Sequence, residues 1–235
     1  MSLRSDLLTA FWNRFPEDRV RVAVVGEDPD KRAGVLLGMR AYLGFDPSWE
    51  KAPPTRARPA ERRHRGPIAG IREVEEEPAP DARRELTVTS VPDGGGEGAV
   101  PVDDAETVAR ALRRARALTA STRTPPLFDL YVCAEGGAHD LVVGDAGSGE
   151  RFLLARSWVA IEAPWGRAIG SSASLQLPAT LAAGGDGLPV PGTRRHGGVL
   201  ASLTGGLLDR RHAVATATTH ALASLVYPLL SSRPL

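Results

Sequence analysis

The order of apolar and polar residues at the start of the chain predicts a helix, a strand and a second helix. Over residues 3–15 the apolar side chains recur at helical spacing: Leu3, Leu7, Leu8, Phe11, Trp12 and Phe15. Residues 20–25 are mostly β-branched and apolar, which predicts a buried strand. That strand ends at Gly26-Glu27-Asp28-Pro29, and a second helix is expected from about Asp30 to Leu43. This alternation indicates an α/β fold.

Later segments continue the alternation. Further strands are expected at or near residues 85–91, 128–134, 151–162 and 167–175. Asp103, with Glu106 three residues later, forms a capping box for a helix that runs to about residue 119. Asp209 begins a last helix that ends near Pro228. We therefore expect a single α/β domain over residues 1–235.

Residues 46–85 interrupt this pattern. They contain seven prolines between Pro47 and Pro80, and a run of arginines is followed by a run of glutamates. A stretch this long without apolar periodicity is typical of disordered or functional insertions. We expect a solvated insertion whose two halves partly neutralise each other. The alternative is that its basic half contacts phosphates, although no aromatic residues interleave the arginines.

Composition narrows the classes of partner. The chain has 29 basic and 28 acidic residues, so its net charge of +1 gives no drive toward nucleic acid or an anionic membrane. No apolar run approaches the ~20 residues of a membrane-spanning helix, and the N-terminus lacks a secretory profile. Cys133 is the single cysteine, which excludes an internal disulfide. These features favour a cytoplasmic protein that binds neither nucleic acid nor membrane.

Three loops are expected to follow strands, at Gly26–Lys31, Asp93–Gly98 and Glu135–Gly137. In open α/β sheets ligands bind beyond the carboxyl ends of the strands. None of the three loops has the spacing of a Walker loop or of a dinucleotide-binding G-x-G-x-x-G turn. The five histidines show no metal-ligand spacing, and Cys133 lies in an apolar strand, which predicts a buried, inert thiol.

Six segments match, in order, the motifs of one family. Residues 24–31 are similar to its opening strand and Thr/Ser-x-Asn-Pro-x-Lys loop, and residues 197–210 to its Gly-Ala-Ile-Gly-x-Leu-Thr-x-Gly-Leu-x-Thr-Arg block. The other matching segments are residues 100–117, 128–137, 158–161 and 175–178. The chain thus resembles a divergent member of the inosine/xanthosine triphosphatase family, which is related to the Maf and inosine-triphosphatase fold, over about residues 20–228.

The resemblance implies a mixed central sheet flanked by helices, with two lobes and a cleft between them. We expect the strand near residues 20–25 to be central, with helices over 104–119 and 209–226 packed on the sheet. The implied activity is hydrolysis of ITP or XTP to the diphosphate and phosphate, with Mg²⁺, or Mn²⁺ as the alternative, as cofactor. Such chemistry depends on positioning and charge neutralisation. The assembly is left open between a monomer and a homodimer.

The resemblance also implies site residues. Glu135 and Glu106 are the expected catalytic carboxylates, and with Asp93 they are the expected metal ligands. Asp129 is the next carboxylate in order, and Glu97 is an alternative to Asp93. Lys31 is the expected phosphate cation, and the other expected substrate-binding residues are Gly26, Asp28, Gly136, Gly137 and Arg195.

Several departures keep a second function open. Asp28 replaces the asparagine of the family, so Glu27 and Asp28 add negative charge where a triphosphate would lie. Glu106 has a structural alternative, because it also suits a helix start and a pairing with Arg110 one turn later. Lys31 has the alternative of an ordinary lysine at a helix start. The second hypothesis is a member of the same fold that has lost its metal site and binds a protein or a nucleotide.

Overall fold

The structure is a computed structural model. It describes residues 3–15, 17–44, 84–92, 101, 103–121, 127–145, 149–178 and 198–231. Most of the predicted insertion, over residues 46–83, lies outside the described residues, as do Asp93, Glu97 and Arg195.

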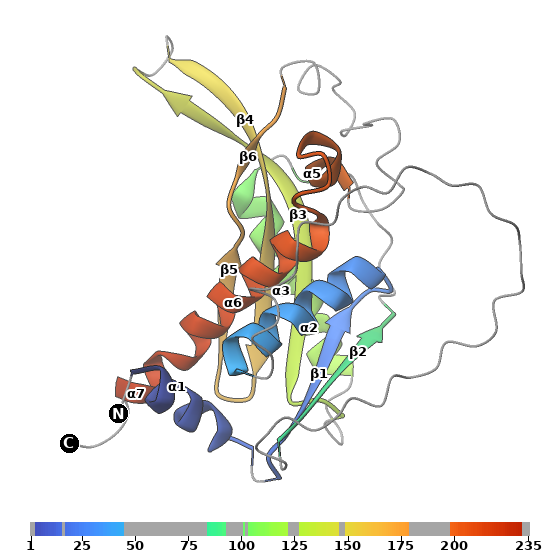
Figure 1. Cartoon of the computed structure of the whole chain (residues 1–235), viewed down its shortest axis with the longest axis vertical. Coiled ribbons are helices and arrows are strands. Elements are labelled where there is room, and N and C mark those ends of the chain that lie inside the picture. Colours follow the sequence, from blue (N-terminus) through green and yellow to red (C-terminus); the bar gives the residue numbers. More distant parts are fainter. Residues whose placement is uncertain are drawn as a thin grey trace, which may run out of the picture.

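The centre of the protein is a six-stranded mixed sheet with the order β2-β1-β3-β4-β5, and β6 pairs with β4 beside this path. β1 is parallel to both β2 and β3, whereas β4 is antiparallel to β3, β5 and β6. The strands are β1 (Arg19–Val25), β2 (Glu85–Val91), β3 (Leu130–Val143), β4 (Glu150–Ala163), β5 (Gly166–Ser171) and β6 (Leu175–Gln176). Figure 1 shows the β3–β4 hairpin extending beyond the rest of the sheet.

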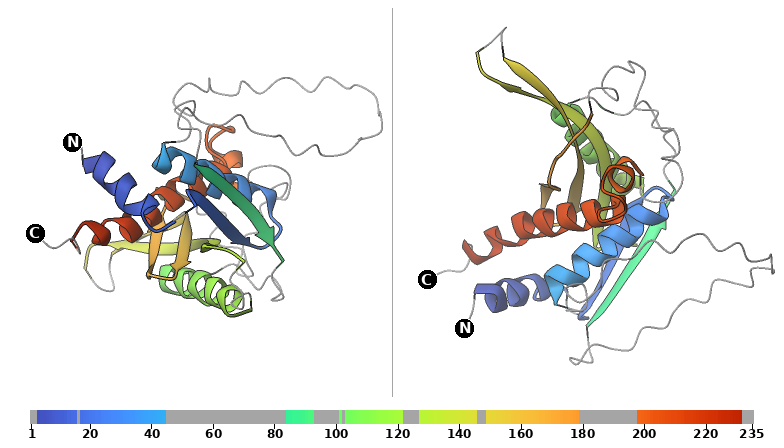
Figure 2. Two further views of the ribbon diagram at one scale, coloured as in Figure 1. Left: turned by 90° about the horizontal axis from the view of Figure 1, so that it is seen from below. Right: turned by 45° about the horizontal axis from the view of Figure 1, so that its top comes forward.

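Helices cover both faces of this sheet. The helices are α1 (Leu3–Trp12), α2 (Pro29–Leu43), α3 (Asp104–Ser121), α5 (Gly198–Leu203), α6 (Arg210–Val226) and α7 (Pro228–Ser231). α3 lies on one face, and α2 and α6 lie on the other (Figure 2). Two hydrophobic cores result, one in each layer between helix and sheet.

β1 contributes to both cores, which explains its continuous apolar sequence. Val20, Val22 and Val24 are fully buried in the core shared with α2 and α6. Ala23 and Val25 point to the other face, where they pack with α3. A strand that is buried on both faces needs apolar residues at every position, not at alternate ones. β1 has a neighbour on each side as expected, although β3 is the middle strand of the path.

Glycines allow α6 to lie very close to its neighbours. A side-chain carbon at Gly34 would be 2.7 Å from the backbone oxygen of Arg211, and one at Gly38 would be 2.8 Å from Cβ of Thr218. A side chain at Gly170 of β5 would collide with the backbone of α6 in the same way. Gly34 and Gly38 lie one turn apart on α2, so together they form the flat surface on which α6 rests.

The predicted fold class is confirmed as α/β, with a mixed central sheet flanked by helices. The two lobes with a cleft between them stay a prediction. One boundary was wrong, because the strand predicted to end at Ala134 continues to Val143. Gly136 and Gly137, expected in a turn, instead pair with Ser157 and Arg156 of β4. The short helix α5 was not predicted, and the strand expected near 167–175 is divided into β5 and β6.

The segment Arg210–Leu230 is long and apolar enough to cross a membrane by length and composition alone. In the structure it forms α6 and most of α7, and its buried residues, among them Val214, Leu222 and Val226, belong to the core over β4 and β5. Packing in this core accounts for its apolar composition.

Candidate functional site

Glu135 is a buried carboxylate beyond the carboxyl end of β1. The parallel pairing of β1 with β3 matches Val24 with Val132, and β1 ends one residue after Val24. Glu135 therefore lies past that end, on the face of β3 that α3 covers, and only 7% of its surface is exposed. This is the edge of the sheet where α/β proteins place their ligands.

Two cations from opposite faces of the sheet meet at this carboxylate. Arg114 of α3 donates from Nη1 to Oε1 of Glu135. Lys31, in the first turns of α2, places Nζ 3.8 Å from Oε2. Both cationic side chains are largely buried. Burial of a charged group is costly unless an opposite charge compensates for it, because burial removes the water that would otherwise stabilise the charge. Each oxygen of Glu135 thus has its own cation.

The loop between β1 and α2 lies beside these groups. Gly26 has a φ of +92°, which favours glycine, and a side-chain carbon there would be 3.9 Å from Nη2 of Arg114. The Arg114 guanidinium therefore has one nitrogen on Glu135 and the other near the Gly26 turn.

Asp28 caps the start of α2. Its carboxylate accepts hydrogen bonds from the backbone amides of Asp30, at 2.9 Å, and Lys31, at 3.3 Å, and from Nη1 of Arg210 at 2.7 Å. Burial opposes ionisation of Asp28, but the Arg210 guanidinium and the two amides outweigh it, so its pKa lies below the usual range. The charge that Asp28 adds to the loop is therefore balanced by Arg210 of α6.

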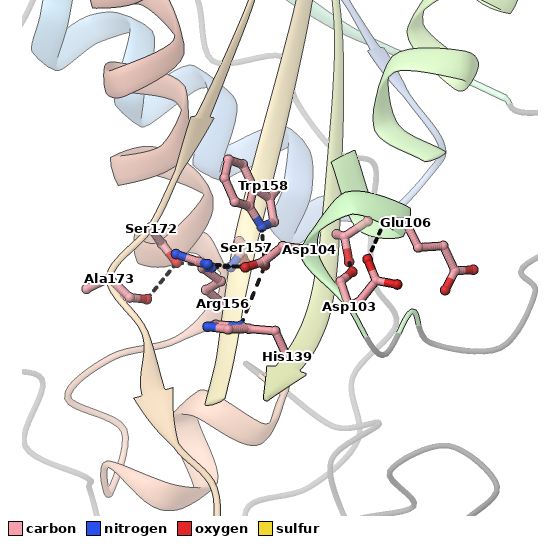
Figure 3. A network of polar contacts seen from close by, with 10 residues as sticks. Asp103, Asp104, Glu106, His139, Arg156, Ser157, Trp158, Ser172 and Ala173 are labelled. Carbon is pink, nitrogen blue, oxygen red and sulfur yellow. Dashed lines mark hydrogen bonds and ion pairs between the residues drawn. The ribbon is translucent and has the colours of Figure 1, made fainter. Parts of the chain in front are cut away.

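Glu106 has other partners than Glu135. Its backbone amide donates to Asp103 Oδ1 at 2.7 Å, which confirms Asp103 as the helix cap. Its carboxylate contacts Arg110 Nη2 at 3.4 Å and is partly exposed. Figure 3 shows the Glu106 side chain pointing away from the polar network around Asp104. Among the described residues no hydrogen bond or ion pair joins Glu106 to Glu135. Its role as a metal ligand stays a prediction.

The two glycines after Glu135 have different surroundings. A side-chain carbon at Gly137 would lie far inside contact distance of Oγ1 of Thr107 and 3.1 Å from its Cγ2. Thr107 is fully buried in α3, so Gly137 is needed for the close approach of that helix. A side chain at Gly136 would meet nothing within 4 Å. Gly136 is therefore the one of the two with open space beside it.

Asp129 lies at the other end of β3. It precedes Leu130, the first residue of the strand, so it is about 20 Å from Glu135 along an extended backbone. Its carboxylate accepts from the backbone amide of Arg21 at 2.7 Å and from both ends of that guanidinium, at 3.2 and 3.0 Å. Asp129 thus ties β1 to β3 and cannot reach the Glu135 site in this arrangement.

Sequence reasoning missed a second polar network, which is drawn in Figure 3. Asp104, in the first turn of α3, accepts from Nε of Arg156 at 3.0 Å and from Nε1 of Trp158 at 2.7 Å. Nδ1 of His139 lies 3.5 Å from the same carboxylate. Burial opposes ionisation of Asp104, but the bonds from Arg156 and Trp158 outweigh it and lower its pKa. The network fastens the start of α3 to β3 and β4, next to Glu135.

Arg114 and Arg210 were also absent from the predicted site. Arg114 lies in a segment that resembles the family, so a signal was present, but no spacing rule connects it with Glu135. Arg210 follows the predicted cap Asp209, whose carboxylate accepts from the backbone amide of His212 at 2.9 Å. Its pairing with Asp28 depends on how α6 lies over α2.

The carboxylates of the described residues decide whether a magnesium ion could bind here. They contain no group of three or more His, Cys, Asp or Glu side chains placed to hold a metal ion. Glu135 is the carboxylate at the strand end, and both its oxygens face cations. Mg²⁺ is commonly held by one or two carboxylates together with substrate phosphates. Glu135 therefore fits a metal that arrives with phosphates, and it does not form a metal site by itself.

Comparison with known proteins supports the fold and assigns no family. No protein-family model matches the chain, and no curated protein matches it. Among solved structures it is similar to the crystal structure of protein VC0702 from Vibrio cholerae, with 19% sequence identity and a TM-score of 0.53. The match covers 89% of this chain and 96% of the other. At this identity the similarity shows a shared fold alone.

Proposed function

We propose that the protein hydrolyses non-canonical purine nucleoside triphosphates, ITP or XTP, to the diphosphate and phosphate. The observation that carries the proposal is the buried Glu135 between Arg114 and Lys31, beside the Gly26 turn and past the end of β1. Metal-dependent hydrolysis of a triphosphate needs cations and close backbone for the phosphates and a carboxylate for the metal, and this edge of the sheet offers all three. The purine preference rests on the sequence resemblance.

In the proposed site the cationic residues and the carboxylate have different roles. Lys31 and Arg114 bind phosphate oxygens, and Gly26 lets the phosphates approach the backbone because it has no side chain. Glu135 is the carboxylate that would hold Mg²⁺, or Mn²⁺ in its place, against the phosphates. When bound, the metal neutralises phosphate charge as the bond to the terminal phosphate breaks and water adds to it.

Phosphate release tests this proposal. We would measure it for ITP, XTP, ATP and GTP, with and without Mg²⁺, for the wild type and three variants. Glu135→Gln should lower turnover by about 10²-fold or more, because phosphate charge is then left unneutralised. Glu106→Gln should do the same if Glu106 is a metal ligand. If Glu106 only pairs with Arg110, turnover should stay intact and stability should fall by about 0.5 kcal/mol or less.

Glu162→Gln is the matched control. Glu162 also pairs with an arginine of α3, with Arg116 Nε at 3.0 Å from its Oε1, but it lies toward the opposite end of β4 from the hairpin tip. Its loss should leave turnover unchanged. Magnesium-independent release, or equal activity of the Glu135 and Glu162 variants, would refute the proposed role of the site.

The second candidate function is binding without hydrolysis, by a member of this fold whose metal site has degenerated. The observation that favours it is that both oxygens of Glu135 face cations and that no cluster of metal ligands occurs among the described residues. Calorimetric titration with ITP separates the two functions. Binding without any magnesium-dependent turnover would select the second. Cytoplasmic location, and the lack of nucleic-acid or membrane partners, stay expectations from composition.

A further inference from the structure

We propose that Arg114 is a phosphate-binding residue, and that a polyphosphate chain binds by taking Arg114 and Lys31 away from Glu135. The inference rests on the proposed function in placing phosphates at this edge of the sheet. It concerns binding alone, however, and so holds for an enzyme and for a protein that binds without turnover.

The position of the Arg114 guanidinium supports this role. Nη1 is bonded to Oε1 of Glu135, while Nη2 is near the place where a side-chain carbon of residue 26 would be, at 3.9 Å. The planar fork of arginine binds phosphate with two parallel N–H groups. An anion over the Gly26 turn would therefore lie within reach of this guanidinium through a rotation of its end, without movement of α3.

The three groups are held by different elements, which makes an exchange of partners mechanically simple. Arg114 comes from α3, Lys31 from α2 and Glu135 from β3, and the two helices lie on opposite faces of the sheet. Within the described part of the chain, Glu135 is contacted by the ends of the Arg114 and Lys31 side chains and by the thiol of Cys133, its neighbour on the same strand. The long side chains of Lys31 and Arg114 have several rotatable bonds, whereas Glu135 belongs to β3 and is held at this level by its pairing with Trp158 of β4. The two cationic side chains thus have more rotatable bonds than Glu135 with which to turn toward a ligand.

Charge explains why the ligand should carry several phosphates. Glu135 is a single negative charge facing two cations, and it must be displaced by a stronger anion. A phosphate chain has several negative charges and can occupy both cations at once. Orthophosphate lacks the length and charge for this and should bind much more weakly.

The experiment is calorimetric titration with inorganic tripolyphosphate, pyrophosphate and orthophosphate in the presence of a chelator, so that no metal or hydrolysis contributes. Arg114→Gln should weaken tripolyphosphate binding by about tenfold or more, since one charge-assisted hydrogen-bonding partner is lost. Arg114→Lys keeps the positive charge but lacks the planar fork of arginine, so its affinity for tripolyphosphate should lie between those of the wild type and Arg114→Gln. Arg116→Gln, two residues along α3 and paired with Glu162, is the matched control and should bind as the wild type does.

Glu135→Gln gives the sharpest test. It removes both the competitor for the two cations and the charge that repels phosphate, so tripolyphosphate should bind several-fold more tightly while hydrolysis of nucleotides falls. Circular dichroism checks folding, and if this variant does not fold, the Arg114 series decides alone. Four results would overturn the inference. Two concern the site variants: unchanged or weaker tripolyphosphate binding by folded Glu135→Gln, and wild-type affinity of Arg114→Gln. The other two are a loss of affinity in Arg116→Gln equal to that in Arg114→Gln, and no tripolyphosphate binding by the wild type. Exchange of this kind without hydrolysis of any nucleotide would support it and refute the enzymatic function.

Discussion

Substitution of Gly137 by alanine tests whether the two glycines after Glu135 serve packing or a ligand. A methyl group at residue 137 would lie far inside contact distance of Oγ1 of Thr107, and real side-chain carbons do not come within 3.0 Å of such atoms. Thr107 is fully buried, and its hydroxyl donates to the backbone oxygen of Asp103 at 2.7 Å. Either the threonine must rotate or α3 must move away from β3.

Each of these responses has a known cost. Rotation breaks the bond to Asp103 and leaves a buried hydroxyl unpaired, which costs about 1–3 kcal/mol. Movement of α3 is a case of overpacking, which also costs about 1–3 kcal/mol. The protein should adopt whichever response costs less free energy, so we expect the free energy of unfolding to fall by about 2 kcal/mol. For a protein of 235 residues this lowers the Tm by roughly 4–8 °C.

Thermal unfolding followed by circular dichroism measures the effect, with Gly136→Ala as the control. That substitution introduces the same methyl group one residue earlier, where nothing lies within 4 Å, and should change stability by no more than about 0.5 kcal/mol. The double variant Gly137→Ala/Thr107→Ala removes the colliding atoms. It should be more stable than the sum of the two single changes predicts, because the two residues are in contact.

A Gly137→Ala protein as stable as the wild type would refute the packing argument, as would equal losses from both glycine variants. Phosphate release from the same proteins then addresses the ligand. If Gly136 lies against substrate, Gly136→Ala should weaken activity without loss of stability, which is the reverse of the behaviour expected for Gly137→Ala.

Two other predictions concern ionisation. The pKa of Asp104 is lowered in the folded protein, so its contribution to stability is present above its ordinary pKa of about 4 and is lost as the pH falls through its lower folded value. Asp104→Asn should therefore lower the Tm at neutral pH, with a difference from the wild type that shrinks below about pH 4; a constant difference would contradict this account. Burial raises the pKa of Cys133 to about 12, so the thiol of the folded protein should not react with a disulfide reagent at mildly alkaline pH, and should react fully in guanidinium chloride. Rapid reaction of the folded protein would show that this strand is accessible.

Predictions from the sequence were correct where the residue pattern within a single segment was enough to identify the element. The apolar run at residues 20–25 is β1, and the caps Asp103 and Asp209 each accept a backbone amide three residues later. The two glycines after Ala134 were misinterpreted as a turn, because glycine within a strand can also mark a place where another group approaches the backbone closely. Thr107 lies against Gly137, and β4 pairs with β3 from Tyr131 to Val143.

The sequence by itself determined most of the elements of this protein and their order, because helix and strand periodicity and helix caps are local properties of the chain. The exceptions are the short helix α5, the second half of β3 and the division of β5 from β6. It also indicated Lys31 and Glu135 as site residues, through a resemblance. Only the tertiary structure decided which charges meet. Arg114 reaches Glu135 because α3 covers one face of the sheet, and Lys31 reaches the same carboxylate because α2 covers the other. Contacts between layers depend on how the layers pack, and no spacing within one segment encodes them.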